Sequence, residues 1–216
     1  MIVIEKTVLP SPEQWEIIIE GMRNPKNSWS RMDSTFEGEF CVGGNDYLLM
    51  ENLAKGGAVH AKYRRMIPVY LTINAPLYWW KEFDKYKVGT VANSCSTMHK
   101  IHAKEFELGD FSWEHLVGDP YERDVDDPVG ILNIVIDALN TARKEFLETK
   151  EKDFWWQMIQ LLPTSYNQKR TVMLNYEVLC NIYHSRKNHK LDEWHTFCDW
   201  IRGLPLSELI TGEYDD

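Results

Sequence analysis

Basic side chains alternate with aromatic or amide side chains at four places in the sequence. These clusters are Lys62-Tyr63-Arg64-Arg65, Lys85-Tyr86-Lys87, Gln168-Lys169-Arg170 and Arg186-Lys187-Asn188-His189-Lys190. Lysine and arginine bind phosphate oxygens, and aromatic rings contact bases and cations. Any one such cluster is typical of a solvated surface. Four of them together indicate a pocket for a small anion with an aromatic part, such as a nucleotide.

Other chemistries have weaker support. The sequence contains neither Gly-x-x-x-x-Gly-Lys-Ser/Thr nor Gly-x-Gly-x-x-Gly. His99 with His102, and His195 with Cys198, have a spacing that can hold zinc on a helix. Because no carboxylate completes a pattern such as His-Glu-x-x-His, we predict surface or core histidines and no metal. Ser94-Cys95-Ser96 lies near His99 but lacks a Gly-x-Ser-x-Gly turn, so we interpret it as the start of a helix.

Length and composition bound the class of protein. A chain of 216 residues predicts a single domain over residues 1–216. A net charge of −9 disfavours binding to extended nucleic acid, because the phosphate backbone is repelled on average. No apolar run is long enough for a membrane span, and Met1–Pro10 does not resemble a secretory signal. Four cysteines without a Cys-x-x-Cys pair then predict reduced thiols in a cytoplasmic protein.

The elements expected from local patterns give a mainly helical α+β domain with a small antiparallel sheet. We expect a strand over residues 1–9 and a helix that Ser11 caps, with Pro12 in its first turn and Gln14 completing a capping box. A loop over 24–45, with a short strand near Phe40, leads to a helix over 46–55 that Asp46 caps. The remaining expected elements are an extended segment at 59–74, helices at 75–87 and 96–108, a surface loop or insertion at 109–127, a helix starting at Pro128 after an Asp127 cap, and helices at 152–161, 165–184 and 191–202.

Nine tryptophans indicate a strongly aromatic core. Trp79-Trp80 and Trp155-Trp156 are adjacent pairs, and neighbours on a helix point about 100° apart. We therefore expect one member of each pair in the core, while the other is free to line a pocket.

Two stretches carry a resemblance to a known family. The first is a strand end, Thr72-Ile73-Asn74-Ala75-Pro76-Leu77-Tyr78, followed by Lys81-Glu82, Lys85-Tyr86-Lys87, Asn93 and Ser96. The second contains Leu162-Pro163, Asn175, Leu179, Asn181 and Arg186 in fixed spacing. The order of these residues resembles the flavin-dependent thymidylate synthase (thymidylate synthase complementing protein) family over residues 46–100 and 155–202.

The sequence departs from the family pattern at several of these positions. Lys85 and Lys87 stand where the family has arginines, Tyr86 replaces a histidine, and Glu82 replaces a glutamine. Ser94 stands at a glutamate position, and Met98 and Ile159 stand at positions of nucleotide-binding arginines. Each lost arginine would remove a charge-assisted hydrogen bond worth roughly 1.5–3 kcal/mol. The resemblance therefore supports the prediction of the fold more strongly than the prediction of the reaction.

The resemblance implies a nucleotide site and a flavin site. The residues implied for FAD are Lys85, Tyr86, Lys87 and Asn175. Those implied for a dUMP-like substrate are Lys81, Glu82, Asn93, Ser96 and Arg186. An active member would be a methyltransferase of nucleotide biosynthesis that transfers a methylene group from methylenetetrahydrofolate to dUMP, with NADPH reducing the flavin. The family also implies a homotetramer.

Three interpretations stay open at this point. The first is a diverged flavin-dependent thymidylate synthase that is still active. The second is a protein on the same scaffold that binds or sequesters a nucleotide without turnover. The third is an unrelated helical protein whose basic clusters bind a partner or single-stranded nucleic acid.

Overall fold

The computed structural model describes residues 1–214, which group into two compact units. Unit 1 consists of Met1–Val3, Ile73–Lys85 and Asn93–Arg170. Unit 2 consists of Ile4–Thr72, Tyr86–Ala92 and the described chain from Thr171 onward. The expectation of a single domain over residues 1–216 stays a prediction.

A four-stranded antiparallel sheet confirms the expected small sheet. Its strands are β1 (Val3–Val8), β2 (Pro68–Pro76), β3 (Val91–Ser94) and β4 (Asn167–Asn175), in the order β1-β2-β4-β3. Every strand contains residues of both units. The fold is therefore the mainly helical α+β class that the sequence predicts.

Side chains along strand β2 alternate between buried and more exposed positions. Val69, Leu71 and Ile73 are fully buried, whereas the residues between them are more exposed. The extended segment predicted at 59–74 is wrong in its first half, because η3 (Lys62–Met66) is a 3-10 helix. The strand near Phe40 is reduced to a single bridge between Thr35 and Cys41.

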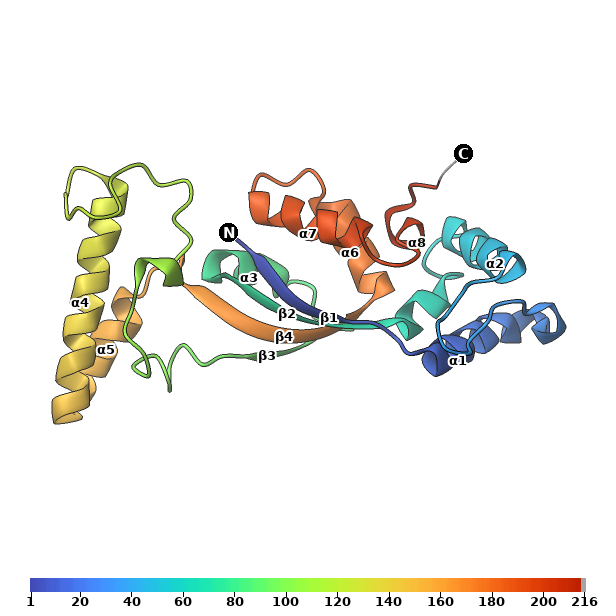
Figure 1. Cartoon of the computed structure of the whole chain (residues 1–216), viewed down its shortest axis with the longest axis horizontal. Coiled ribbons are helices and arrows are strands. Elements are labelled where there is room, and N and C mark those ends of the chain that lie inside the picture. The colour runs from blue at the N-terminus through green and yellow to red at the C-terminus, as the bar shows by residue number, and fades with distance from the viewer. Residues whose placement is uncertain (215–216) are drawn as a thin grey trace. The chain divides into compact units, whose positions relative to one another are not determined.

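Unit 1 is built on two helices, α4 (Pro128–Thr149) and α5 (Lys152–Leu161), which pack side by side (Figure 1). The predicted start of α4 is confirmed, because the Asp127 carboxylate accepts the Gly130 N–H and Pro128 occupies the first position. Buried side chains from α4, α5 and the preceding segment form the core of this unit: Ile101, Phe106, Phe111, Leu132, Ile136, Leu139, Ala142 and Met158.

The predicted helix over 96–108 is wrong. After β3 the chain runs through turns, and the Ser96 hydroxyl accepts the N–H groups of Met98 and His99 at 3.3 and 2.8 Å. Such a local bond satisfies the backbone without a helix. Further along, the side chain of Asn140 binds both the N–H and the C=O of Phe106, so α4 supplies the partners that a helix would have supplied.

The other elements of unit 1 are short. Helix α3 spans Leu77–Phe83, less than the predicted 75–87. Trp79 and Trp80 are both fully buried, so both members of this pair belong to the core, where one was expected. In the second pair Trp156 is exposed while Trp155 packs against the core. Apart from η4 (Leu108–Asp110), residues 109–127 contain neither helix nor strand.

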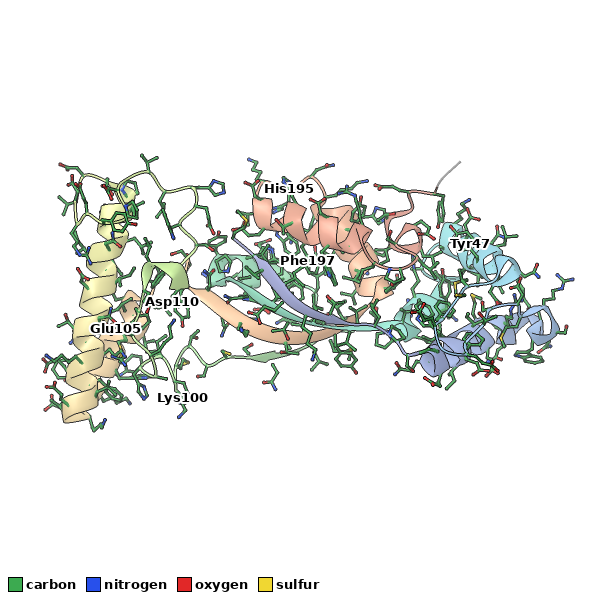
Figure 2. The ribbon with its side chains drawn as sticks, viewed as in Figure 1. Tyr47, Lys100, Glu105, Asp110, His195 and Phe197 are labelled. Carbon is green, nitrogen blue, oxygen red and sulfur yellow. The ribbon has the colours of Figure 1, made fainter. Side chains whose placement is uncertain are left out.

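In unit 2, helix α6 (Tyr176–Arg186) contacts α7 (Asp192–Arg202), α8 (Glu208–Thr211) and η3. Helix α1 (Pro12–Arg23) begins with the predicted capping box between Ser11 and Gln14. Figure 2 labels two residues of α7, and their burial shows that the helix is amphipathic: Phe197 is fully buried and His195 is exposed.

Two predictions for unit 2 are wrong. Helix α2 (Gly44–Lys55) begins after Gly43, not at Asp46, which lies in its first turn. The helix predicted at 165–184 is divided into β4 and α6, and the break falls at Asn175, whose side chain caps α6. Over residues 1–214 no helix has the length and apolar character that crossing a bilayer requires.

Candidate functional site

Arg186 and Tyr86 form the centre of the candidate site in unit 2. Arg186 ends α6, and its Nε donates to the Tyr86 hydroxyl at 2.9 Å. The guanidinium carbon lies 5.6 Å from the centre of the Tyr86 ring and 4.9 Å from that of the Trp194 ring. Both distances are within the range of cation–π contacts. A half-buried cation is thus fixed by one hydroxyl and two rings.

Asn175 lies at the other end of α6. Its Oδ1 accepts the Val178 N–H at 3.0 Å, which is the N-cap bond of the helix. Its Nδ2 faces Gly89, where a Cβ would lie 3.2 Å from Nδ2 and from Val178 Cγ2. Gly89 also has φ +79°, which L-residues rarely adopt. Glycine at this position lets the Tyr86–Ala92 segment approach α6 closely, and exposed Lys87 lies on the same segment.

The residues assigned to unit 1 are more exposed. Lys81 and Glu82 lie on α3, and the Lys85 ammonium donates to both carboxylate oxygens of Glu82 at 2.8 Å. Exposed ion pairs contribute little to stability, so a ligand could replace either partner at small cost. Asn93 is exposed on β3, and Ser96 binds the turn that follows it. The binding roles of these five residues stay predictions.

Two of the four basic clusters use their arginines in internal contacts. Arg170 stacks on Trp80 at 4.3 Å and pairs with Asp84 at 2.8 Å in unit 1. Arg64 is buried in unit 2 against Glu177. The prediction that all four clusters line one anion pocket is therefore wrong for these two arginines.

Sequence reasoning missed the role of Trp194. The residue was expected in the core, and it is fully buried. Its ring is nevertheless the flat surface on which Arg186 rests, and the ring of Tyr86 meets it edge-on at 6.2 Å. The sequence signal for this site was the combination of aromatic and basic residues in Lys85-Tyr86-Lys87 and in the cluster that begins at Arg186. Neither cluster contains Trp194, so the signal did not point to it.

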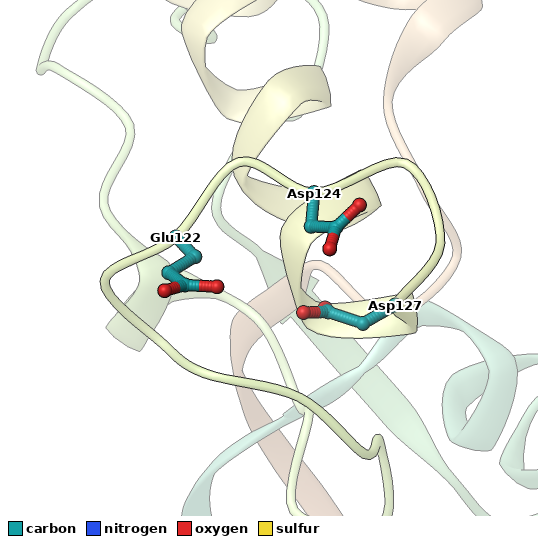
Figure 3. A group of neighbouring side chains, drawn as sticks. All are labelled: Glu122, Asp124 and Asp127. Carbon is teal, nitrogen blue, oxygen red and sulfur yellow. The ribbon is translucent and has the colours of Figure 1, made fainter.

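Among the described residues, those that lie close enough together to bind a metal are three carboxylates and not the histidine pairs identified in the sequence. The carboxylates of Glu122, Asp124 and Asp127 approach within 4.8 Å of one another (Figure 3). Asp127 caps α4, and the other two are exposed, so we assign no metal to this group. In the pair His195 and Cys198, burial raises the pKa of the Cys198 thiol to about 11.

The fold matches solved structures along almost the whole chain. Thymidylate synthase X (ThyX) from Helicobacter pylori, solved with FAD and dUMP, is 18% identical with a TM-score of 0.64, and the match covers 99% of this chain and 97% of that one. A second structure of the same enzyme with FAD and dUMP is 17% identical, with a TM-score of 0.64 and coverage of 98% and 97%. The UMP/dUMP methylase PolB from Streptomyces cacaoi, bound with 5-Br dUMP, is 13% identical, with a TM-score of 0.59 and coverage of 98% and 94%.

These likenesses establish the architecture. The chain has the fold of the flavin-dependent thymidylate synthases and of a related methylase. No family model matches the sequence, and no curated protein matches it either.

Proposed function

We propose that the protein binds a nucleotide of the dUMP type on this scaffold, with Arg186 as its principal cation. One observation carries the proposal. The resemblance assigns Tyr86 to the flavin and Arg186 to the nucleotide, and these residues, 100 positions apart in sequence, share a hydrogen bond within unit 2. Transfer of a hydride or a methylene group requires the flavin and the nucleotide to lie next to each other. Residues of the two binding sites, such as Tyr86 and Arg186, would then be neighbours.

The chemistry of Arg186 suits an anionic or carbonyl-rich ligand. A guanidinium is planar, always charged and presents several donors in fixed geometry. The Tyr86 hydroxyl and the Trp194 ring restrict its motion, so less side-chain entropy is lost when it binds a ligand. The matched structures were solved with dUMP and FAD or with 5-Br dUMP, which supports the same ligand classes here.

The residues assigned to FAD fit the polar part of that cofactor. Lys85 and Lys87 are exposed ammonium groups of the kind that bind phosphate oxygens, Tyr86 offers a ring, and Asn175 offers an amide nitrogen. Bound reduced FAD would supply the hydride for a methyl group derived from methylenetetrahydrofolate, with NADPH as the electron donor. The chain's own part would be to bind and orient the nucleotide through Arg186, Lys81, Glu82, Asn93 and Ser96.

A non-catalytic nucleotide-binding protein is the second candidate. Tyr86 replaces the family's histidine, and its hydroxyl is already bonded to Arg186. Ser94, at the family's glutamate position, is exposed on β3. Tyr86 and Ser94 thus replace the family's histidine and glutamate, whereas Arg186 matches the family's nucleotide-binding arginine. The homotetramer and the cytoplasmic location belong to either version of the proposal.

The first test is the visible absorbance of the freshly purified protein. Near-stoichiometric bound FAD would favour the enzyme and lead to an assay of dUMP-dependent turnover. A colourless protein that takes up no added FAD would exclude the enzyme and favour the binding protein.

The second test measures dUMP affinity by calorimetry. We expect Arg186→Ala to weaken binding by at least about tenfold, the loss of one charge-assisted hydrogen bond. Arg202→Ala is the matched control, because Arg202 also donates from Nε to a tyrosine hydroxyl, that of Tyr183, and lies over its ring at 5.2 Å. Equal dUMP affinity in wild type and in folded Arg186→Ala would refute the assignment.

A further inference from the structure

A polar cavity of about 590 Å³ lies in unit 2 between the end of α1, the two 3-10 turns that follow it and α2. The turns are η1 (Asn24–Lys26) and η2 (Trp29–Arg31). The described residues that line the cavity include three cations, Arg23, Lys26 and Arg31. The rest of this lining consists of three amides, two serine hydroxyls and two leucines, with no acidic side chain. In a chain of net charge −9, such a lining makes the cavity a local attractor of anions.

Arg23 has one donor that the protein does not use. Its side chain is 3% exposed. Nε donates to Asp46 at 2.5 Å, and Nη1 donates to the carbonyl and hydroxyl oxygens of Ser28 at 3.2 and 3.3 Å. Nη2 is buried and has no acceptor among the described residues. A buried donor without a partner is costly, and native structures normally supply one from protein, water or ligand.

Asp46 has little capacity left for this donor. One of its oxygens accepts Arg23 Nε, and the other accepts the N–H of Asp33, the N–H of Ser34 and the Ser34 hydroxyl at 2.7–3.0 Å. Protein groups also satisfy the start of α2, where the Asp33 carboxylate accepts the N–H groups of Asn45 and Asp46. The helix end is therefore not the anion site, and side chains must supply the binding groups.

Lys26 and Arg31 complete the cationic wall. Both are exposed, and within residues 1–214 neither forms an ion pair. Asn27, with φ +47°, lies between the two turns, and residues of both turns line the cavity. Lys26 and Arg31 thus each belong to a short 3-10 turn.

We propose that this cavity binds the phosphate group of a small phosphorylated molecule, with Arg23 Nη2, Lys26 and Arg31 as the donors. The exposed Lys26 and Arg31 and the open Nη2 of Arg23, whose charge Asp46 offsets in part, suit a phosphate group. The cavity volume of about 590 Å³ has room for a ligand larger than one phosphate ion. None of the nine residues assigned to FAD or dUMP by resemblance lines this cavity.

The test uses inorganic pyrophosphate and inorganic phosphate as probes, titrated by calorimetry into the full-length protein at constant ionic strength. We expect pyrophosphate to bind more tightly than phosphate, and its affinity to fall as salt rises. Lys26→Ala and Arg31→Ala should each weaken binding about tenfold, and the double variant about a hundredfold. Both side chains are exposed, so the variants should fold. Arg65→Ala, an exposed arginine outside the cavity lining, is the matched control.

The same variants test the pyrophosphate site and the dUMP site independently of each other. Arg186→Ala should weaken dUMP binding and leave pyrophosphate binding unchanged, whereas the Lys26→Ala/Arg31→Ala double variant should weaken pyrophosphate binding and leave dUMP binding unchanged. Unchanged pyrophosphate affinity in the double variant, or no binding of either probe to wild type at millimolar concentration, would overturn the proposal. Parallel loss of both ligands in the double variant would also overturn it.

Discussion

Arg64 and Arg23 are both buried in unit 2, but their guanidinium groups are bonded to different extents. Arg64 uses all three nitrogens: Nε and Nη2 bind the Glu177 carboxylate at 2.9 and 2.8 Å, and Nη1 binds the Leu209 carbonyl at 3.1 Å. Arg23 binds Asp46 and Ser28 and leaves Nη2 without an acceptor among the described residues.

The difference separates a structural ion pair from a ligand site. The Arg64 pair joins η3, α6 and the start of α8, so its bonds hold three elements together. Arg23 lines an open cavity beside two further cations. An incomplete set of hydrogen bonds on a buried charge is thus better evidence for a ligand than the charge itself.

The largest expected effect is on the Arg64 pair. Glu177→Gln should lower the free energy of unfolding by about 3–5 kcal/mol, because it leaves a buried guanidinium without its counter-charge. Urea unfolding followed by circular dichroism would measure it. Arg123→Ala is the control, because the ion pair of Arg123 with Asp137 is exposed, and it should leave the unfolding midpoint unchanged. A change below about 1 kcal/mol in Glu177→Gln would contradict a structural role for the pair.

The next effect is ligand-induced stabilisation at Arg23. Pyrophosphate at a hundred times its dissociation constant should stabilise wild type by about 2.7 kcal/mol, since a ligand that binds only the folded state shifts the equilibrium by mass action. The Lys26→Ala/Arg31→Ala variant, whose dissociation constant should be about a hundredfold higher, should show a shift of only about 0.4 kcal/mol at the same concentration. Glu177→Gln should show the full shift from its lower starting point. Loss of the shift in Glu177→Gln would mean that the two arginines are not independent.

A smaller effect concerns acid. Burial alone would raise the pKa of Asp46, but hydrogen bonds from Ser34, Asp33 and Arg23 lower it below the ordinary 3.8. A depressed folded-state pKa stabilises the protein at pH values above 3.8, and this stability is lost as the pH falls below that value. Unfolding measured between pH 6 and acid should therefore show a decline that is reduced in Asp46→Asn. Asp137→Asn, which removes an exposed carboxylate, should keep the wild-type decline; an identical decline in Asp46→Asn would refute the role of this carboxylate.

The features predicted correctly from sequence depend on neighbours within a few residues. The Ser11–Gln14 capping box and the Asp127 cap of α4 are local contacts, and the structure has both. Asp46 was predicted to cap α2, but Asp33, more than ten residues earlier, binds the N–H groups at the start of that helix. A distant side chain thereby moved the helix start, and Asp46 was left to pair with Arg23.

The same limit applies to the candidate site. Local patterns marked Lys85-Tyr86-Lys87 and the segment from Arg186 as basic and aromatic clusters, yet they gave no reason to join Tyr86 to Arg186 across 100 residues. Only the family resemblance placed both residues in neighbouring sites. The open donor of Arg23 was not predictable at all, since it depends on which oxygens of Asp46, Ser28 and Asp33 are already used.

The smallest effect extends the comparison to a half-buried arginine. Tyr86→Phe keeps the ring beside Arg186 but removes the hydroxyl that accepts from Nε, a bond worth about 1 kcal/mol net. If Tyr86 positions Arg186, dUMP affinity should fall several-fold while protein stability changes little. Tyr183→Phe is the matched control, because it removes the hydroxyl bonded to Arg202 on α7 and should leave dUMP affinity unchanged. Equal effects of the two variants on dUMP affinity would show that Tyr86 acts on stability in general, and that Arg186 does not depend on it for its position.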